Sequence, residues 1–237
     1  MTAVLGYVTQ AISVILCDRR INFGKYQEFG YSDENKKLVD LTEMGWASGA
    51  GLATFLDEFK DNLDKEYIKD TDDIIRAFNV AVGQAKEQTP HLSKEIDKSS
   101  AMISWFGVPS EQQMTFRVGI LSNHHFGSNI ALINDEEIQT LYPGDYIDNP
   151  DLVKDFEERF EKSIGFQGDI EDILDRMLHM FDEISSNSKY VSKCCDIGLH
   201  CFTQNGILKL KISGEVNELI SEIENGNINN RLELINQ

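Results

Sequence analysis

Residues 2–20 read TAVLGYVTQAISVILCDRR, and they contain two runs that favour β-structure. Residues 2–9 are rich in Thr, Val, Leu and Tyr, and residues 12–18 are mostly β-branched and apolar. Only Gln10 and Ala11 separate the two runs, so the stretch predicts an antiparallel hairpin. Because chain ends usually fray, a strand that starts at the second residue indicates that this end is held in a fixed position.

The rest of the chain alternates between pairs of strands and pairs of helices. Leu52, Phe55 and Leu56 begin a helical pattern after a strand-like run at 45–51, and Asn134-Asp135 predicts a hairpin turn within 129–142. This order predicts an α+β fold, a four-layer αββα sandwich of two antiparallel sheets flanked by helices, in one domain over residues 1–237. Further strands are expected at 37–41, 101–108, 114–121, 194–202 and 206–213, and helices at 52–66, 71–87, 151–164, 169–186 and 215–225.

The composition excludes several classes of partner. The chain has 237 residues with 40 acidic and 22 basic side chains, a formal net charge of −18. Nucleic acids and anionic lipids both require clustered Lys and Arg, so neither is expected to bind. No apolar stretch approaches the ~18 residues of a membrane helix, and no basic segment precedes an apolar run as in a signal peptide. We therefore expect a cytoplasmic protein whose four cysteines are free thiols.

A small-residue turn, Gly49-Ala50-Gly51, joins a predicted strand to a predicted helix. It resembles the start of a dinucleotide-binding fingerprint, but the third glycine position is Thr54 and no βαβ unit surrounds it. Two other interpretations remain open: close packing of strand and helix, or backbone N–H groups that face an anion.

Histidines and cysteines gather at His124-His125 and within 194–201. On a strand, adjacent side chains point to opposite faces and positions four apart lie ~13 Å from each other. Such a run cannot by itself supply the tetrahedral ligands of a zinc site. We expect no metal and no cofactor.

Thr2, Asp18 and Lys37 form a third constellation. Cleavage of Met1 would expose Thr2 with both a hydroxyl and a free α-amine, and an N-terminal threonine of this kind can act as a nucleophile with its own amine as base. Thr2 and Asp18 lie on the two arms of the predicted hairpin, and Lys37 begins the next strand. A lysine cation held by Asp18 would favour a deprotonated threonine oxygen.

The first ~65 residues resemble proteasome β-subunits and the bacterial HslV peptidase of the N-terminal nucleophile hydrolase superfamily. In that family a catalytic Thr opens the first strand, Asp-x-Arg ends the second, a Lys starts the third and a small-residue turn opens the first helix. This chain has Thr2, then Asp18-Arg19-Arg20, then Lys37, then Ala50-Gly51-Leu52-Ala53 at matching intervals. An insertion falls at 24–35.

The resemblance implies a role for each matching residue. Thr2 would be the nucleophile and, through its amine, the base. Asp18 and Lys37 would adjust the reactivity of Thr2, and Arg20 would support the structure of the site. The Gly51 N–H would stabilise an oxyanion. In addition, the resemblance implies that the substrate is bound by Asn22 and by two small residues of the first specificity pocket, Gly49 and Ala53.

The later half departs from the family pattern. Residues 143–152 contain no Gly-Ser-Gly turn. At the helix-to-strand junction Ser192 would take the place of the family's supporting serine, although no Asp precedes it at the family's spacing. The function implied is threonine-type hydrolysis of peptides or unfolded proteins by a homo-oligomeric ring, and the resemblance allows an unfoldase ATPase as a partner. The alternative is a non-catalytic, proteasome-like structural or binding subunit, which is the expected case where Met1 is retained.

Overall fold

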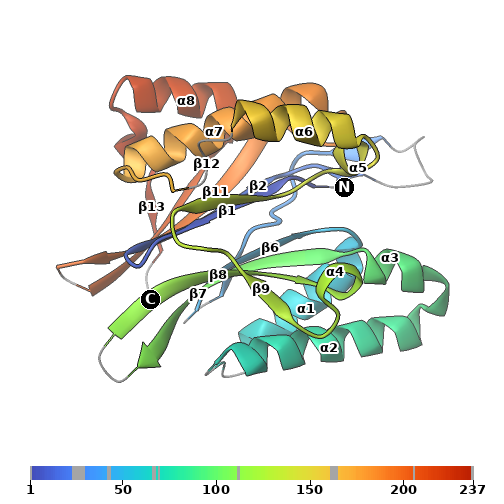
Figure 1. Ribbon diagram of the computed structural model, residues 1–237. Helices are drawn as coiled ribbons and strands as arrows, with labels where there is room; N and C mark the ends of the chain where they lie inside the picture. The colour runs from blue at the N-terminus through green and yellow to red at the C-terminus, as the bar shows by residue number, and fades with distance from the viewer. Residues whose placement is uncertain are drawn as a thin grey trace.

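The computed structural model describes residues 2–22, 30–41, 44–65, 68, 70–110, 113–160, 165–204 and 206–235, with backbone only at 22, 65, 108–110 and 113. These residues form an α+β structure in which two large antiparallel sheets lie between helices (Figure 1). The α+β class and the two antiparallel sheets expected from the sequence are confirmed.

The larger sheet has six strands in the order β10-β1-β2-β11-β12-β13. The predicted N-terminal hairpin is its centre, with Val4 opposite Cys17 and Val8 opposite Ser13. Both faces of this sheet are covered, which explains why its central strands are apolar without strict alternation. The strands are β1 (Val4–Val8), β2 (Ile12–Asp18), β10 (Glu137–Leu141), β11 (Cys194–Thr203), β12 (Gly206–Glu215) and β13 (Glu233–Leu234).

The second sheet has five strands in the order β5-β6-β7-β8-β9, and a separate short pair, β3-β4, lies outside both sheets. The longest pairing in the five-stranded sheet joins β7 and β8, from Ser100 opposite Ser122 onward. The strands are β3 (Ile21–Asn22), β4 (Tyr31–Ser32), β5 (Val39–Leu41), β6 (Gly45–Ala50), β7 (Ser100–Ser110), β8 (Gln113–Ser122) and β9 (Ile130–Leu132).

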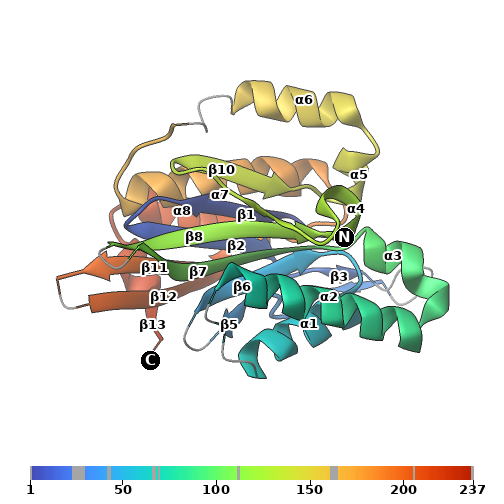
Figure 2. The ribbon, with the colours of Figure 1, turned by 60° about the horizontal axis from the view of Figure 1, so that its bottom comes forward.

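The helices lie on the outer sides of the two sheets (Figures 1 and 2). On one side are α6, α7 and α8, and on the other are α1 and α2. Asp70 caps α2, and Asp169 and Asp172 form a capping box at the start of α7, which satisfies backbone N–H groups there. The helices are α1 (Ala53–Lys65), α2 (Thr71–Gln88), α3 (Ser93–Asp97), α4 (Asn123–Phe126), α5 (Gly144–Ile147), α6 (Pro150–Arg159), α7 (Ile170–Asn187) and α8 (Val216–Glu224), with 3₁₀ turns at Pro90–Leu92 and Ile228–Arg231.

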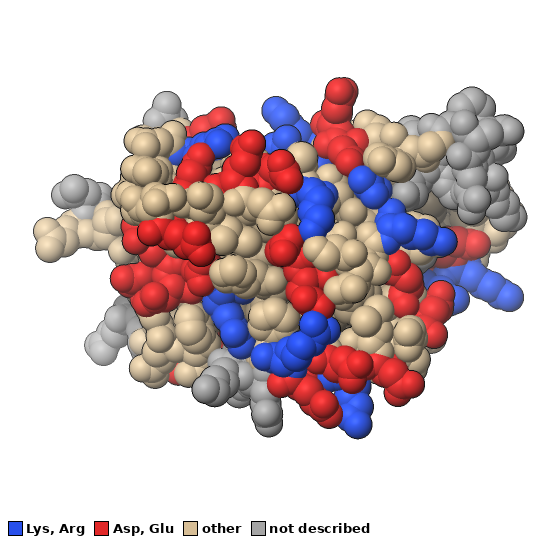
Figure 3. Space-filling view, turned by 90° about the horizontal axis from the view of Figure 1, so that it is seen from above, with Lys and Arg blue, Asp and Glu red and all other residues tan. Residues whose placement is uncertain are grey.

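Three apolar clusters fill the spaces between these layers. One packs α7 and α8 on the six-stranded sheet, another packs α1 and α2 on the five-stranded sheet, and the third lies between the sheets. The sheets approach closely at Gly6, where an added Cβ would lie 2.4 Å from Met102 Sδ. On the outer face that carries α6 to α8, acidic and basic side chains are interspersed (Figure 3).

The structure corrects the prediction for residues 129–142. They form two strands, but β9 pairs with β8 in one sheet and β10 pairs with β1 in the other. Asn134-Asp135 therefore lies in a crossover between sheets rather than in a hairpin turn. The short strands read Ile-Ala-Leu and Glu-Ile-Gln-Thr-Leu, and neither run carries a local signal for the sheet that it joins. Predicted residues 161–164 of the helix that begins near 151 lie outside the described residues.

Candidate active site

The three residues singled out by the sequence lie together at one end of the sheets. Thr2 precedes β1, Asp18 ends β2, and Lys37 precedes β5 of the opposite sheet. The antiparallel ladder continues beyond Val4, because the Asp18 N–H donates to the Ala3 carbonyl at 3.3 Å. This register brings the start of the first strand and the end of the second side by side, and the third residue arrives from the facing sheet.

Lys37 connects the hydroxyl to the carboxylate. Its Nζ lies 2.8 Å from Thr2 Oγ1, and it donates to both Asp18 oxygens, at 3.1 and 3.0 Å. The Asp18 side chain is 0% exposed and that of Lys37 is 11% exposed. The ammonium group therefore places a positive charge against the threonine oxygen, at a position sheltered from water.

Two backbone donors also hold Asp18. The Ala3 N–H donates to Oδ1 at 3.2 Å, and the Arg20 N–H donates to Oδ2 at 2.8 Å. Burial raises the pKa of Asp18, while Lys37 and these two N–H groups act in the opposite direction. The carboxylate is thus oriented by four donor contacts, and its position determines where the Lys37 ammonium lies.

The Arg20 side chain pairs with Asp33. Its Nε and one terminal nitrogen contact the two Asp33 oxygens, each at 2.8 Å, and the other terminal nitrogen donates to the Lys189 carbonyl at 3.0 Å. The guanidinium also lies over the Tyr31 ring, 3.7 Å from its centroid. The sequence contained no signal for Asp33, which lies in a polar loop segment.

Gly51, expected to supply an oxyanion-binding N–H, is exposed at the start of α1 and has φ = +134°. A Cβ there would lie 2.3 Å from Ser99 Oγ, so glycine is required on two grounds. Ser99 Oγ accepts from the Leu52 N–H at 2.9 Å and donates to the Glu95 carbonyl at 2.8 Å. These hydrogen bonds hold the turn that carries the Gly51 backbone.

The small residues expected in a specificity pocket have different surroundings. Gly49 is buried in β6, and a Cβ there would lie 2.7 Å from the Ser100 carbonyl oxygen and 2.8 Å from the Leu56 side chain. This geometry favours close packing of strand and helix, one of the interpretations left open by the sequence. Ala53, by contrast, is exposed as the first residue of α1.

The remaining residues named from the sequence are Ser192, Asn22 and Met1. Ser192 is buried, accepts from the Cys194 N–H at 2.9 Å, and acts to lower the pKa of Asp33. The Asn22 side chain and Met1 lie outside the described residues.

The histidines and cysteines include deeply buried groups. His200 is buried between the sheets, and its ring lies 5.2 Å from that of Phe116. Burial, with a smaller contribution from Lys209, lowers the pKa of His200 to about 4. Burial also raises the pKa of the Cys17 thiol to about 12. Within the described ranges, no group of three or more His, Cys, Asp or Glu side chains could hold a metal ion.

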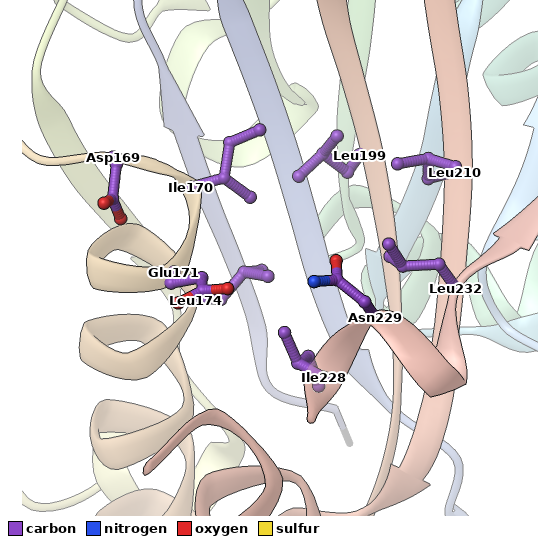
Figure 4. A pocket seen from close by; sticks show the side chains of 9 residues that line it. All are labelled: Asp169, Ile170, Glu171, Leu174, Leu199, Leu210, Ile228, Asn229 and Leu232. Carbon is purple, nitrogen blue, oxygen red and sulfur yellow. The ribbon is translucent and has the colours of Figure 1, made fainter. Parts of the chain in front are cut away.

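A cavity of about 360 Å³ opens on the outer side of the six-stranded sheet (Figure 4). Its walls are mainly aliphatic, from α7, β11, β12 and the 3₁₀ turn after α8, and the Asn229 side chain points into it (Figure 4). None of the residues singled out in the sequence lines this cavity. Among the described helices, none is long and apolar enough to cross a membrane.

Fold and site together define an α+β protein of two antiparallel sheets with a threonine, a lysine and an aspartate in contact near its N-terminus. Comparison with solved structures finds this fold in Anbu from Hyphomicrobium sp. strain MC1, with a TM-score of 0.62 and 15% identity over 95% of this chain and 93% of that one. At this identity the likeness concerns the fold alone.

The family assignment made from the N-terminal motif is corrected by these comparisons. No family model matches the chain, and no curated protein matches it either. The solved structure reported above is Anbu, not a proteasome β-subunit or HslV. Four short features at matching intervals, spread over ~65 residues, were too few to identify a family.

Proposed function

We propose that the chain is a threonine-type amidohydrolase acting on peptides, with Thr2 as an N-terminal nucleophile after removal of Met1. The observation that carries this proposal is the contact of Lys37 Nζ with Thr2 Oγ1 at 2.8 Å while the same ammonium is ion-paired to the buried Asp18. A cation in this place lowers the cost of developing negative charge on the threonine oxygen.

The reaction follows from the groups available. The free α-amine of Thr2 takes the hydroxyl proton, and Oγ1 attacks the amide carbon. The Gly51 N–H stabilises the resulting oxyanion, an effect usually worth ~3–4 kcal/mol. When the C–N bond breaks, the proton moves from the α-amine to the leaving amine and an ester remains on Thr2. Water, deprotonated by the same α-amine, then hydrolyses that ester and regenerates the hydroxyl.

Lys37 acts as an electrostatic residue in this scheme rather than as the base. Its ammonium already donates to both oxygens of Asp18, and a group held as an ion pair is a poor proton acceptor. Removal of Met1 is therefore required, since the α-amine of Thr2 exists only in the processed chain.

The fold and the assembly belong to the same proposal. We assign the two sheets and their outer helices to a four-layer αββα sandwich in a single domain. We also expect a homo-oligomer that encloses the site. Exposed apolar side chains such as Tyr31 and Ile147, which are 58% and 64% exposed, are candidates for its interfaces.

The test begins with the intact mass of the purified protein, which should be that of the chain without Met1. Processed protein should cleave fluorogenic peptide amides, Thr2→Ala should abolish turnover, and Thr2→Ser should retain part of it. Thr71→Ala, at the start of α2, is the matched control and should be fully active. Unchanged cleavage by Thr2→Ala would rule out Thr2 as the nucleophile. A mass that retains Met1 would leave a non-catalytic role as the better explanation.

A further inference from the structure

Arg20 is the point at which three separate segments of the chain meet. Its guanidinium contacts Asp33, the Lys189 carbonyl and the Tyr31 ring, so the end of β2, the β4 segment and the connection into β11 converge on one side chain. Its backbone N–H, at the other end of the residue, donates to Asp18 Oδ2 at 2.8 Å. A contact made by the side chain therefore constrains the amide that orients Asp18.

Asp33 is the residue that holds this guanidinium. The pair is bidentate, with both N–O distances at 2.8 Å, the geometry that fixes an arginine most firmly. The buried Ser192 also acts to lower the pKa of Asp33. Hydrogen bonding from Arg20, opposed by partial burial, holds the pKa of Asp33 below its ordinary value, so the pair persists under mildly acidic conditions.

We propose that Asp33 is a positioning residue of the Thr2 site: by clamping Arg20 it fixes the Asp18 carboxylate, and through it the Lys37 ammonium against the threonine hydroxyl. The inference rests on the proposed function. Each link is a contact described above: Asp33 to the Arg20 side chain, the Arg20 amide to Asp18, Asp18 to Lys37, and Lys37 to Thr2.

Loss of Asp33 would have a specific electrostatic consequence. The charge of the Asp18 carboxylate also acts on Arg20. A guanidinium released from Asp33 would turn toward Asp18 and compete there with Lys37. The ammonium would shift away from Thr2 Oγ1, and a displacement of about 1 Å in a reacting site can reduce the rate on the order of a hundredfold.

The test measures how fast Thr2 is acylated by a β-lactone, followed by the intact mass of the processed protein. In this reaction Oγ1 attacks the lactone carbonyl, the ring C–O bond breaks, and the released alkoxide takes up the hydroxyl proton. Asp33→Ala and Asp33→Asn should acylate about tenfold to a hundredfold more slowly, and Asp33→Glu should recover part of the rate. Glu34→Ala, an exposed acidic neighbour, is the matched control and should react like the unsubstituted chain.

The same variants are compared for peptide turnover and thermal unfolding. A positioning role predicts a lower kcat at nearly constant KM, measured well below the unfolding temperature of each variant. Acylation of Asp33→Ala at the unsubstituted rate would overturn the inference and leave the proposed function intact. The inference would also be overturned if Asp33→Ala acylates slowly only under conditions in which the variant is partly unfolded, because the loss of rate would then reflect stability alone. Absence of acylation in the unsubstituted, processed chain would overturn the proposed function, and the inference with it.

Discussion

Lys37 Nζ lies 2.8 Å from Thr2 Oγ1, although Thr2 leads into the six-stranded sheet and Lys37 into the five-stranded sheet. The contact therefore depends on how the two sheets pack. It also depends on Asp18, whose buried carboxylate holds the ammonium in place.

Lys37→Ala should abolish turnover and also destabilise the fold. The substitution leaves the Asp18 carboxylate buried without its ion-pair partner, which typically costs about 3–5 kcal/mol. Chemical denaturation and peptide cleavage measure the two effects separately. In the double variant Lys37→Met, Asp18→Asn no charge is left unpaired, so stability should recover while activity stays absent. Recovery of activity in that variant would contradict the electrostatic role of Lys37.

Gly51→Ala should lower the free energy of unfolding by about 1–3 kcal/mol, the usual cost of strained backbone at positive φ. The added Cβ also meets Ser99, whose Cβ would be 2.6 Å away. Gly83→Ala is the matched control, because Gly83 lies within α2 with nothing within 4 Å of an added Cβ. That variant should be more stable by about 0.5–1 kcal/mol. Equal denaturation midpoints for the two variants would disprove the steric account.

Stability should decrease as the pH falls from about 6.5 to about 4, in part because of His200. Its folded-state pKa, about 4, is below that of an unfolded histidine, so in this window the unfolded chain binds the extra proton. The full effect amounts to about 3 kcal/mol. His200→Phe should flatten this part of the urea-denaturation profile, whereas His125→Gln, on the exposed α4, should leave it unchanged. An identical profile for His200→Phe would exclude this origin.

Substitution of Asp40 should lower the free energy of unfolding more than substitution of Lys209. Lys209 is 1% exposed and Asp40 is 37% exposed, and burial lowers the pKa of the lysine. Asp40→Ala leaves a buried cation unpaired and should cost about 3–5 kcal/mol, whereas Lys209→Met leaves a partly solvated carboxylate and should be close to neutral. Denaturation of both variants at neutral pH measures the difference. Equal losses would indicate that the ion pair itself, rather than desolvation of Lys209, dominates.

The elements with strong local periodicity could be predicted from the sequence. The hairpin at residues 2–18 and the helix that begins near 52 depend on apolar side chains at fixed local spacing, and both are present as expected. The proximity of Thr2 and Asp18 could be predicted for the same reason, since the register of a tight hairpin places its two ends together. The assignment of β9 and β10 to different sheets has no local signature.

The sequence by itself determined the α+β class and the residue types available near the N-terminus for chemistry. Only the tertiary structure decided that Lys37 reaches Thr2 across two sheets, that Gly49 is packed against Leu56, and that Asp33 pairs with Arg20. Local periodicity reports which face of an element is buried, because burial of apolar area follows the repeat of the helix or strand. A polar contact between distant segments follows no repeat, and so it appears only when the sheets have packed.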